Sequence, residues 1–340
     1  MKTLATKYRP QTFAEIVGQD SVKAILTQQL NTKQINNCLI FSGSSGCGKT
    51  TAARIFANSL DEGPADIIEI DAASNNGVDN VRNISSLARA RSIGSTYKTF
   101  IIDEAHMLTT AAWNAFLKCL EEPPAYTVFI FCTTEPQKIP VTVKNRCMRF
   151  NFTRIPSNLI ERRLNEICVS EGIINYLEVT PYLSRICNGE MRNAISLLET
   201  WLRYDPQGAG GIDAAIKAIG NFSYDEYFRL LNVLIDGNTA AILTILDDMY
   251  ERGENMKLLV DSFLSFCLDI TKYVTTGSIE TVNIPPTLEN ELRDVINFHN
   301  PAQYYFYLID KLLDTKNMLK GDIDEASTVK VMFLRMGRLV

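Results

Sequence analysis

The chain has 340 residues, of which 46% are hydrophobic and 21% are charged, and its formal net charge at pH 7 is -5. This composition is typical of a globular protein and excludes a disordered or low-complexity chain, while the length predicts two or three domains. A net acidic chain has no overall attraction for nucleic acid, so any contact with a phosphate backbone requires a local basic surface.

The N-terminal residues MKTLATKYRP carry positive charge, but no apolar stretch long enough for a signal peptide follows them. No later run of about 18 apolar residues could span a bilayer. We therefore expect a cytoplasmic protein without membrane contact. The eight cysteines form no CxxC pair, and only His106 and His299 could add imidazole ligands, so we expect reduced, mostly buried thiols and no zinc.

The stretch from 38 to 60 has the pattern of a phosphate-binding loop. CLIFS (38–42) predicts a buried strand, and TTAARIFANSL (50–60) has the apolar spacing of a helix. Glycines in the loop between them let backbone amides turn inward toward phosphate. Lys49 would reach the β and γ phosphates of ATP, and the Thr50 hydroxyl would bind Mg²⁺. The loop residues expected to hold the nucleotide are Gly43, Ser44, Ser45, Gly46, Cys47, Gly48, Lys49, Thr50 and Thr51.

A second apolar strand ends in two acids, in KTFIIDEAH (98–106). Asp103 would hold Mg²⁺ through water, and Glu104 would align or deprotonate the attacking water. Two acids that merely cap a strand end are the alternative. His106 is expected to pack or to form hydrogen bonds rather than to take part in the chemistry.

VFIFCTTEP (128–136) predicts a third buried strand. Strand ends of a parallel sheet converge on the nucleotide, so Thr134 or Thr133 would form a hydrogen bond to the γ phosphate or to the water. A threonine that only completes the strand end is the alternative.

The segment NNGVDNVRNISSLARA (75–90) reads as a loop that leads into a helix. From Asn76 to Lys98 the basic residues outnumber the acidic ones, and Asp79 is the acidic residue among Arg82, Arg89, Arg91 and Lys98. Helix N-termini and arginines both favour phosphate, although a solvated helix face explains the same pattern.

The remainder of the chain predicts helices. Residues 154–204 read as three short helices, and DPQGAGG (205–211) reads as a hinge. From Phe222 onward, helical apolar spacing is broken at Gly237, Gly253 and Gly277, with a loop near 283–286, which indicates a helical bundle.

Several stretches taken together resemble the tau/gamma subunits of bacterial clamp loaders, in order and in spacing. They are KYRPQTFAEIVGQ (7–19), the glycine loop, IEIDAAS (68–74), FIIDEAHML (100–108), NAFLKCLEEPP (114–124), TTEPQKIPVTVKNRC (133–147) and GEMRNAISLLE (189–199). The resemblance is close over roughly the first 205 residues, and beyond them it extends only to a helical region of suitable length.

This resemblance implies an α/β AAA+ ATPase domain with a parallel five-stranded sheet (1–153), an α-helical lid (154–206) and an all-α collar (207–340). It also implies ATP and Mg²⁺ as cofactors, and a pentameric assembly joined through the collar. In the family, that assembly opens a sliding clamp and loads it on primer-template DNA during replication.

The resemblance also assigns roles to residues. Thr134 matches the residue that senses the γ phosphate, and Arg192 matches the lid arginine that reaches back to it. Arg146 matches the arginine that acts in trans on a neighbour's nucleotide, with Asn145 in place of the family's serine. Tyr8, Arg9, Pro10, Val17 and Gly18 match the segments around adenine, and the positions expected near template DNA are Asn76, Val78 and Arg82. A local ion pair is the alternative for Arg146, and an exposed helix charge is the alternative for Arg192.

The sequence departs from the family pattern in one large respect. SLDEGPAD (59–66) replaces a four-cysteine zinc module, which again predicts no zinc, and the end at residue 340 favours comparison with the short gamma-like form. Two other functions remain open. One is an ATP-binding scaffold with weak hydrolysis, and the other is a branch-migration or unwinding motor, because DEAH also occurs in helicases.

Overall fold

The computed structural model describes residues 3–61, 66–92, 94–220, 222–285, 288–298, 302–321 and 324–337. The chain divides into two units, Met1–Glu171 with Leu183–Glu199 and Gly172–Tyr182 with Thr200–Val340. The three-domain boundaries expected from the sequence stay a prediction. Residues 62–65 of the short SLDEGPAD bridge and His299 lie outside the described residues.

A five-stranded parallel sheet forms the centre of the first unit, as the family resemblance implied. The strand order is β2-β3-β4-β1-β5, with parallel pairing between neighbours. The strands are β1 (Cys38–Gly43), β2 (Asp66–Asp71), β3 (Lys98–Asp103), β4 (Thr127–Thr133) and β5 (Met148–Phe152). Because β1 lies between β4 and β5, the loop that follows β1 emerges beside the ends of these two strands, with the end of β3 one strand beyond β4.

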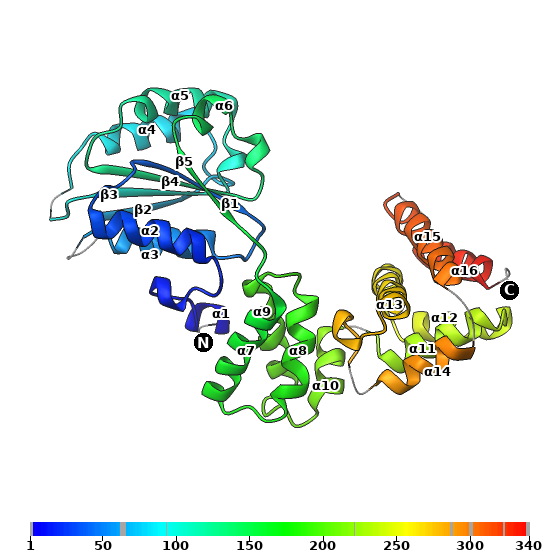
Figure 1. Cartoon of the computed structure of the whole chain (residues 1–340). Helices are drawn as coiled ribbons and strands as arrows, with labels where there is room; N and C mark the ends of the chain where they lie inside the picture. Colours follow the sequence, from blue (N-terminus) through cyan, green and yellow to red (C-terminus); the bar gives the residue numbers. More distant parts are fainter. Residues whose placement is uncertain are drawn as a thin grey trace. The chain divides into compact units, whose positions relative to one another are not determined.

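Helices cover both faces of this sheet (Figure 1). On one face lie α2 (Asp20–Thr32) and α3 (Lys49–Asn58), and on the other lie α4 (Val78–Ala88), α5 (Thr110–Glu121) and α6 (Val141–Lys144). Successive strand residues serve opposite faces: Leu39 packs in the core with α2 and α3, and Ile40 packs in the core with α4 and α5. Burial on both sides explains why the central strands β1, β3 and β4 are largely apolar.

Short elements link the larger ones in this unit. They are α1 (Leu4–Lys7) and the 3-10 turns η1 (Phe13–Glu15), η2 (Ala105–Met107) and η3 (Pro136–Lys138). Three helices follow the sheet, α7 (Ser157–Glu171), α8 (Tyr176–Ile186) and α9 (Met191–Tyr204), which confirms the helices predicted between 154 and 204. The division into units passes through α8 and α9.

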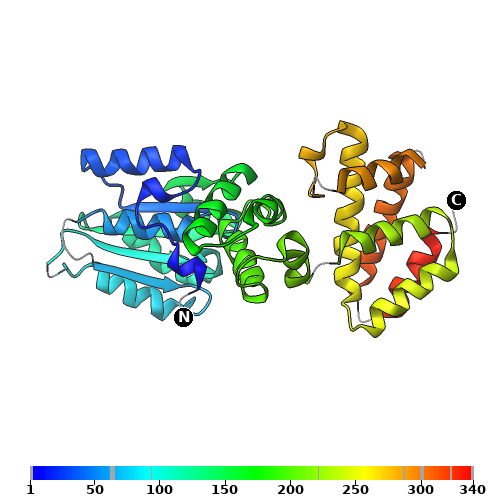
Figure 2. The same ribbon diagram turned by 90° about the horizontal axis from the view of Figure 1, so that it is seen from below.

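The second unit is helical. Its helices are α10 (Gly211–Ile219), α11 (Tyr224–Ile235), α12 (Thr239–Glu251), α13 (Met256–Thr276), α14 (Glu289–Phe298), α15 (Ala302–Met318) and α16 (Glu325–Met336), with the 3-10 turn η4 (Ile279–Thr281). Helices α11 to α16 share one core that contains Phe263 and Phe333, and Figure 2 shows them from yellow-green to red. The predicted break at Gly277 is the left-handed residue (φ +66°) that ends α13.

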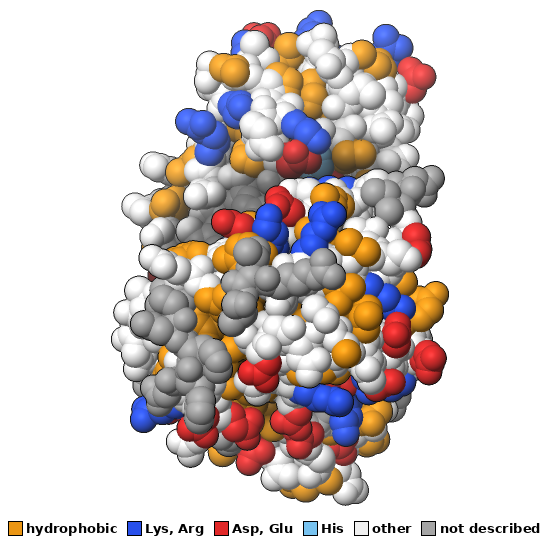
Figure 3. Space-filling model, turned by 90° about the vertical axis from the view of Figure 1, so that its right-hand side faces the viewer, with side chains coloured by type: hydrophobic (Ala, Val, Ile, Leu, Met, Phe, Trp, Pro, Cys, Tyr) orange, Lys and Arg blue, Asp and Glu red, His pale blue; other side chains and the backbone are white. Residues whose placement is uncertain are grey.

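The surface of the second unit includes large apolar side chains. Leu258 and Leu268 on α13 and Phe306 and Leu313 on α15 are exposed. On the face drawn in Figure 3, orange hydrophobic side chains alternate with charged side chains of both signs. The role of this surface in a collar interface stays a prediction.

The described part of the chain lacks two features. No described helix combines the length and the apolar character needed to cross a bilayer. Within the same residues, no group of three or more His, Cys, Asp or Glu side chains could hold a metal ion.

Candidate functional site

The glycine loop joins β1 to α3, in the strand-to-helix setting that the sequence predicted. Gly43, Gly46 and Gly48 have φ values of +152°, +65° and +104°. A Cβ atom on Gly43 would lie 2.3 Å from the carbonyl oxygen of Phe152. A Cβ on Gly46 would lie 3.3 Å from the Cβ of Arg192. Glycine is therefore required both by the backbone conformation and by the close approach of β5 and α9.

Lys49 carries its charge inside this loop. Its side chain is 7% exposed, and its ammonium group donates hydrogen bonds to the carbonyl oxygens of Gly43 (2.9 Å) and Ser44 (2.7 Å). A buried ammonium needs such partners because its desolvation is costly. The cation is thus held at the centre of the loop.

The loop fits a phosphate group. The Ser44 hydroxyl is buried and has no hydrogen-bond partner among the described residues. The first amides of α3, which begins at Lys49, have no acceptors within their own helix. A buried hydroxyl donor, free helix amides and an ammonium group around one loop are the donors that a polyphosphate would satisfy.

The predicted metal-binding pair lies beside the loop. The Thr50 hydroxyl donates to Oδ2 of Asp103 at 2.8 Å, and the backbone amide of Glu104 donates to Oδ1 at 3.0 Å. Parallel pairing of β3 with β4 and of β4 with β1 brings the end of β3 to the start of α3. A threonine hydroxyl and a carboxylate are the oxygen ligands that suit Mg²⁺.

Glu104 follows β3 in a left-handed conformation (φ 46°), which turns its side chain away from the strand direction. Thr134, at the end of β4, donates to Oε2 of Glu104 at 3.4 Å. Thr133 instead is buried, contacts Nδ1 of His106 at 3.3 Å and accepts a hydrogen bond from the amide of Glu135. Of the two threonines that the sequence left open, Thr134 is therefore the one that contacts the predicted catalytic carboxylate.

His106 packs at the same strand ends. Its side chain is 9% exposed, and its ring nitrogens lie 3.4 Å from Glu104 and 3.5 Å from Glu135. This position agrees with the packing and hydrogen-bonding role expected from the sequence.

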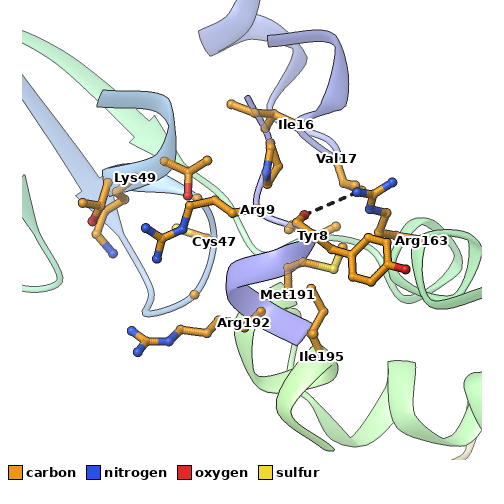
Figure 4. A pocket seen from close by; sticks show the side chains of 17 residues that line it. Tyr8, Arg9, Ile16, Val17, Cys47, Lys49, Arg163, Met191, Arg192 and Ile195 are labelled. Carbon is orange, nitrogen blue, oxygen red and sulfur yellow. Dashed lines mark hydrogen bonds between the residues drawn. The ribbon is translucent and has the colours of Figure 1, made fainter. Parts of the chain in front are cut away.

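A pocket opens between the loop, the N-terminal segment and α7 and α9 (Figure 4). Lys49, Arg9 and Arg192 lie on one side of that view, and Tyr8, Val17 and Ile195 lie on the other. The end with Lys49 is therefore cationic, and the other end is mainly apolar apart from Arg163, which suits a nucleotide with a flat base. The predicted residues in its lining are Tyr8, Arg9, Pro10, Val17, Gly46, Cys47, Gly48, Lys49, Thr50, Thr51 and Arg192.

Other predicted nucleotide-binding residues lie near the pocket without lining it. Gly43 and Ser44 belong to the loop behind Lys49, Ser45 is exposed, and Gly18 (φ +66°) lies against Ile155. Sequence reasoning missed the lining residues Ala5, Ile16, Ile155, Arg163, Met191 and Ile195. Helix α7 carries Arg163, which donates to the carbonyl oxygen of Tyr8 at 3.4 Å, a contact that spans 155 positions and has no local motif.

The N-terminal segment is attached to α7 by a polar contact. Lys7 and the Tyr8 hydroxyl both donate to Oε1 of Glu171 at 2.6 Å. These hydrogen bonds, that from Lys7 first, lower the pKa of the Glu171 carboxyl, while burial and the bond to Glu171 raise the pKa of Tyr8. The contact fixes one wall of the pocket to α7.

Arg146 lies on the short connection between α6 and β5, and its side chain is 34% exposed. Its guanidinium donates to the carbonyl oxygen of Thr142 and to Oε1 of Glu121, each at 2.6 Å. The local ion pair considered from the sequence is therefore present. It leaves further donors of the guanidinium available.

The residues predicted near DNA lie at the start of α4. Asn76 and Val78 are half-buried, and the backbone carbonyl of Asn76 accepts a hydrogen bond from the Thr109 amide at 3.3 Å. Arg82 is 71% exposed and forms an ion pair with Asp79 at 3.2 Å.

Lys98, counted with the basic residues of this segment, is not part of an exposed surface. It is 7% exposed, and its ammonium group donates to the carbonyl of Ala90 (3.0 Å) at the end of α4 and lies 3.5 Å from Asp66. Burial at the start of β3 turns this charge inward, because a helix C-terminus and a carboxylate meet there.

Comparisons with known proteins agree with this geometry. A family model described as DNA polymerase III, delta subunit, matches residues 61–156. The DNA polymerase III subunit tau of Bacillus subtilis is 34% identical over 334 residues, which is 92% of this chain and 59% of that protein. The gamma/tau subunit of Mycobacterium bovis is 40% identical over 297 residues, which is 78% of this chain and 50% of that protein. The chain thus spans about half the length of the curated relatives that it matches.

Among solved structures, the Thermotoga maritima RuvB Holliday junction branch migration motor matches with a TM-score of 0.53 over 67% of this chain and 79% of its own. Its sequence identity is 16%, so the likeness concerns the fold alone. With this AAA+ fold and with 30–40% identity to several relatives over most of its length, the chain is a homologue of the gamma/tau subunits of bacterial DNA polymerase III.

Proposed function

We propose that this chain is an ATP-hydrolysing motor subunit of a sliding-clamp loader, which opens the clamp and places it on primer-template DNA during replication. The observation that carries the proposal is the assembly of Lys49, Thr50, Asp103 and Glu104 around one loop, with Thr50 and Asp103 2.8 Å apart. Its homologues are DNA polymerase III subunits. A cytoplasmic site of action, without membrane contact, is part of this proposal.

In this proposal the loop amides and Lys49 hold the β and γ phosphates of ATP. Thr50 and, through water, Asp103 hold Mg²⁺, which when bound neutralises charge on the phosphates. Glu104 orients the attacking water and accepts its proton, and Thr134 contacts both that carboxylate and the γ phosphate. These groups lie in the loop after β1, at the start of α3, or at and just beyond the ends of β3 and β4.

The apolar end of the pocket would take the adenine base, between Tyr8, Pro10 and Val17. Arg192 extends from α9 toward the side of Lys49 in Figure 4, which supports a contact between the lid and the γ phosphate. Such a contact would link the angle of the lid to the state of the nucleotide.

Arg146 would act on the nucleotide of a neighbouring subunit in a pentamer joined by the helical second unit. Its side chain is partly exposed on a loop beside the edge strand β5, where a neighbour could approach it. An arginine supplied in trans accelerates related phosphoryl transfer by about 10³ to 10⁵. Asn76, Val78 and Arg82 would lie along the template strand, since α4 presents its N-terminus and the exposed Arg82 to solvent.

The test is a reconstitution with the cognate partner subunits and clamp. Wild-type protein should show ATP turnover that depends on clamp and on primer-template DNA. Arg146→Ala should bind ATP normally and lose most of this turnover, by a factor of about 10³ or more. Normal turnover in the Arg146→Ala assembly would contradict the trans role.

Two controls distinguish this proposal from the two alternative functions, a weakly hydrolysing scaffold and a branch-migration or unwinding motor. Glu104→Gln in this chain should abolish its share of turnover, whereas a scaffold with weak hydrolysis would be unaffected by it. A strand-separation assay should show no unwinding, and ATP-dependent unwinding would favour the branch-migration function that the RuvB-like fold leaves open.

A further inference from the structure

Arg146 is held by two acceptors that come from different elements. Its Nη1 donates to the carbonyl oxygen of Thr142, in α6, at 2.6 Å. Its Nη2 donates to Oε1 of Glu121, the last residue of α5, at 2.6 Å. Both bonds are short, as charge-assisted hydrogen bonds are, and together they fix the plane of the guanidinium.

Glu121 lies at the end of a helix that is firmly packed against the sheet. Helix α5 is capped by the Thr109 hydroxyl, and it inserts Trp113, Phe116 and Leu120 into the core against the sheet. Arg146 instead stands on the connection after α6, with a long side chain that has many rotamers. The carboxylate at the end of the anchored helix therefore limits where the guanidinium can go.

The two bonds use only some of the hydrogen-bond donors of the guanidinium. An arginine carries five N–H donors, and Thr142 and Glu121 accept from one each, so three remain for a phosphate group. Asn145 precedes Arg146 where the resembled family has a serine, and the partners of the Arg146 guanidinium here are Thr142 and Glu121.

We infer that Glu121 is a positioning residue for Arg146: it holds the guanidinium in the orientation in which its free donors meet the nucleotide of the neighbouring subunit. This inference rests on the proposed trans role of Arg146. Glu121 touches no nucleotide in this scheme and acts only through the arginine.

The exposure of the pair makes the inference testable. The side chains of Arg146 and Glu121 are 34% and 51% exposed. Ion pairs with this exposure add little to stability, because water already solvates both charges. Removal of the Glu121 carboxylate should therefore leave the fold intact and should change what Arg146 can do.

The experiment compares Glu121→Ala, Glu121→Gln, Arg146→Ala and the Glu121→Ala/Arg146→Ala double variant in the reconstituted assembly. Glu122→Ala is the matched control, since it removes the same charge from the adjacent exposed residue. The measurements are kcat and KM for ATP, and the affinity for ADP with aluminium fluoride, which mimics the transferring phosphoryl group. Melting of each isolated subunit verifies the fold.

Glu121→Ala should lower kcat by about 10- to 100-fold, the range expected from a misplaced catalytic group, with KM for ATP nearly unchanged. It should weaken binding of ADP with aluminium fluoride by a similar factor, and Glu121→Gln should recover part of the loss. The double variant should be no slower than Arg146→Ala, because a positioning residue has no effect once its arginine is gone. Glu122→Ala should behave as wild type.

Three results would overturn the inference: Glu121→Ala equal to Glu122→Ala, Glu121→Ala faster than wild type, or additive losses in the double variant. A faster variant would mean that the carboxylate restrains the arginine. If Glu121→Ala melts at a lower temperature than wild type, the kcat of the isosteric Glu121→Gln variant is used instead to test the inference. If Arg146→Ala itself turns over ATP normally, the proposed trans role fails, whereas a defective Arg146→Ala with a normal Glu121→Ala refutes only the present inference.

Discussion

Gln19 connects the glycine loop to the end of β5, and its removal should weaken both the fold and the proposed nucleotide binding. The side chain is 9% exposed. Its Nε2 donates to the carbonyl oxygens of Thr153 (2.7 Å) and Cys47 (3.3 Å), and its Oε1 accepts from the amide of Thr153 (3.1 Å). The side-chain amide thus bonds to both the N–H and the carbonyl of Thr153, and it also donates to the carbonyl of Cys47 in the loop.

Gln19→Ala leaves three backbone groups without this partner. A lost hydrogen bond costs about 0.5–1.5 kcal/mol net, and more where a buried partner stays unsatisfied, so we expect a loss of about 2–4 kcal/mol in the free energy of unfolding of the first unit. For a unit of this size the loss corresponds to a fall of about 5–15 °C in Tm. The affinity for ATP should fall about tenfold or more, because the loop must be ordered again on binding.

The two tryptophans allow the assay to resolve the units. Trp113 is buried in the first unit and Trp201 in the second. In a Trp201→Phe background, the fluorescence of Trp113 reports urea unfolding of the first unit alone, and a fluorescent ATP analogue reports binding. Gln19→Gly is a matched control for backbone strain, since Gln19 has a φ of 57°. A Gln19→Ala protein with unchanged unfolding and unchanged affinity would refute this account.

Three further predictions follow from the same structure. Lys98→Met should lower the free energy of unfolding by about 2 kcal/mol, because it removes the buried cation between α4 and Asp66, and a neutral effect in urea unfolding would contradict that role. Arg82→Glu should leave stability unchanged but weaken DNA-stimulated ATP turnover. The slope of the logarithm of DNA affinity against the logarithm of salt concentration should fall in magnitude by about one. Unchanged DNA stimulation would reject the DNA contact. Glu171→Gln should destabilise the protein at neutral pH, because Lys7 and Tyr8 lower the pKa of this carboxyl below its usual 4.5. That contribution is present above pH 4.5 and is lost as the pH falls through the lowered pKa, so the difference between Glu171→Gln and wild type in urea unfolding should shrink at acid pH, and a difference that grows there would contradict the assignment.

Local patterns in the sequence determined the nucleotide loop and the core strands. A loop that must curl around phosphate needs glycine at particular positions, and a strand buried on both faces needs a continuous apolar run. Both requirements concern residues that are adjacent in the sequence, so a short pattern is enough to recognise them. The predictions for 38–60 and for the strands at 98 and 128 therefore agree with β1, α3, β3 and β4, within one or two residues at most ends.

The partner of each polar side chain was decided by tertiary structure. The strand pattern did not separate Thr133 from Thr134, although the family resemblance favoured Thr134, and Lys98 was counted with a basic segment. Strand pairing directs Thr134 to Glu104 and buries Thr133 beside His106, while the docking of α4 on the starts of β3 and β4 encloses Lys98. Such contacts join residues tens of positions apart, and no short pattern records them.

The residues that line the pocket likewise come together through long-range contacts that no short sequence pattern records. The sequence by itself located the glycine loop, because its residues are consecutive, whereas Arg163 and Met191 reach the pocket only after α7 and α9 fold against the N-terminal segment. The support of Arg146 by Glu121 likewise exists only once α5 packs against the sheet and ends beside α6. Local chemistry follows from adjacent residues, but the partner and the orientation of a charged group follow from long-range packing.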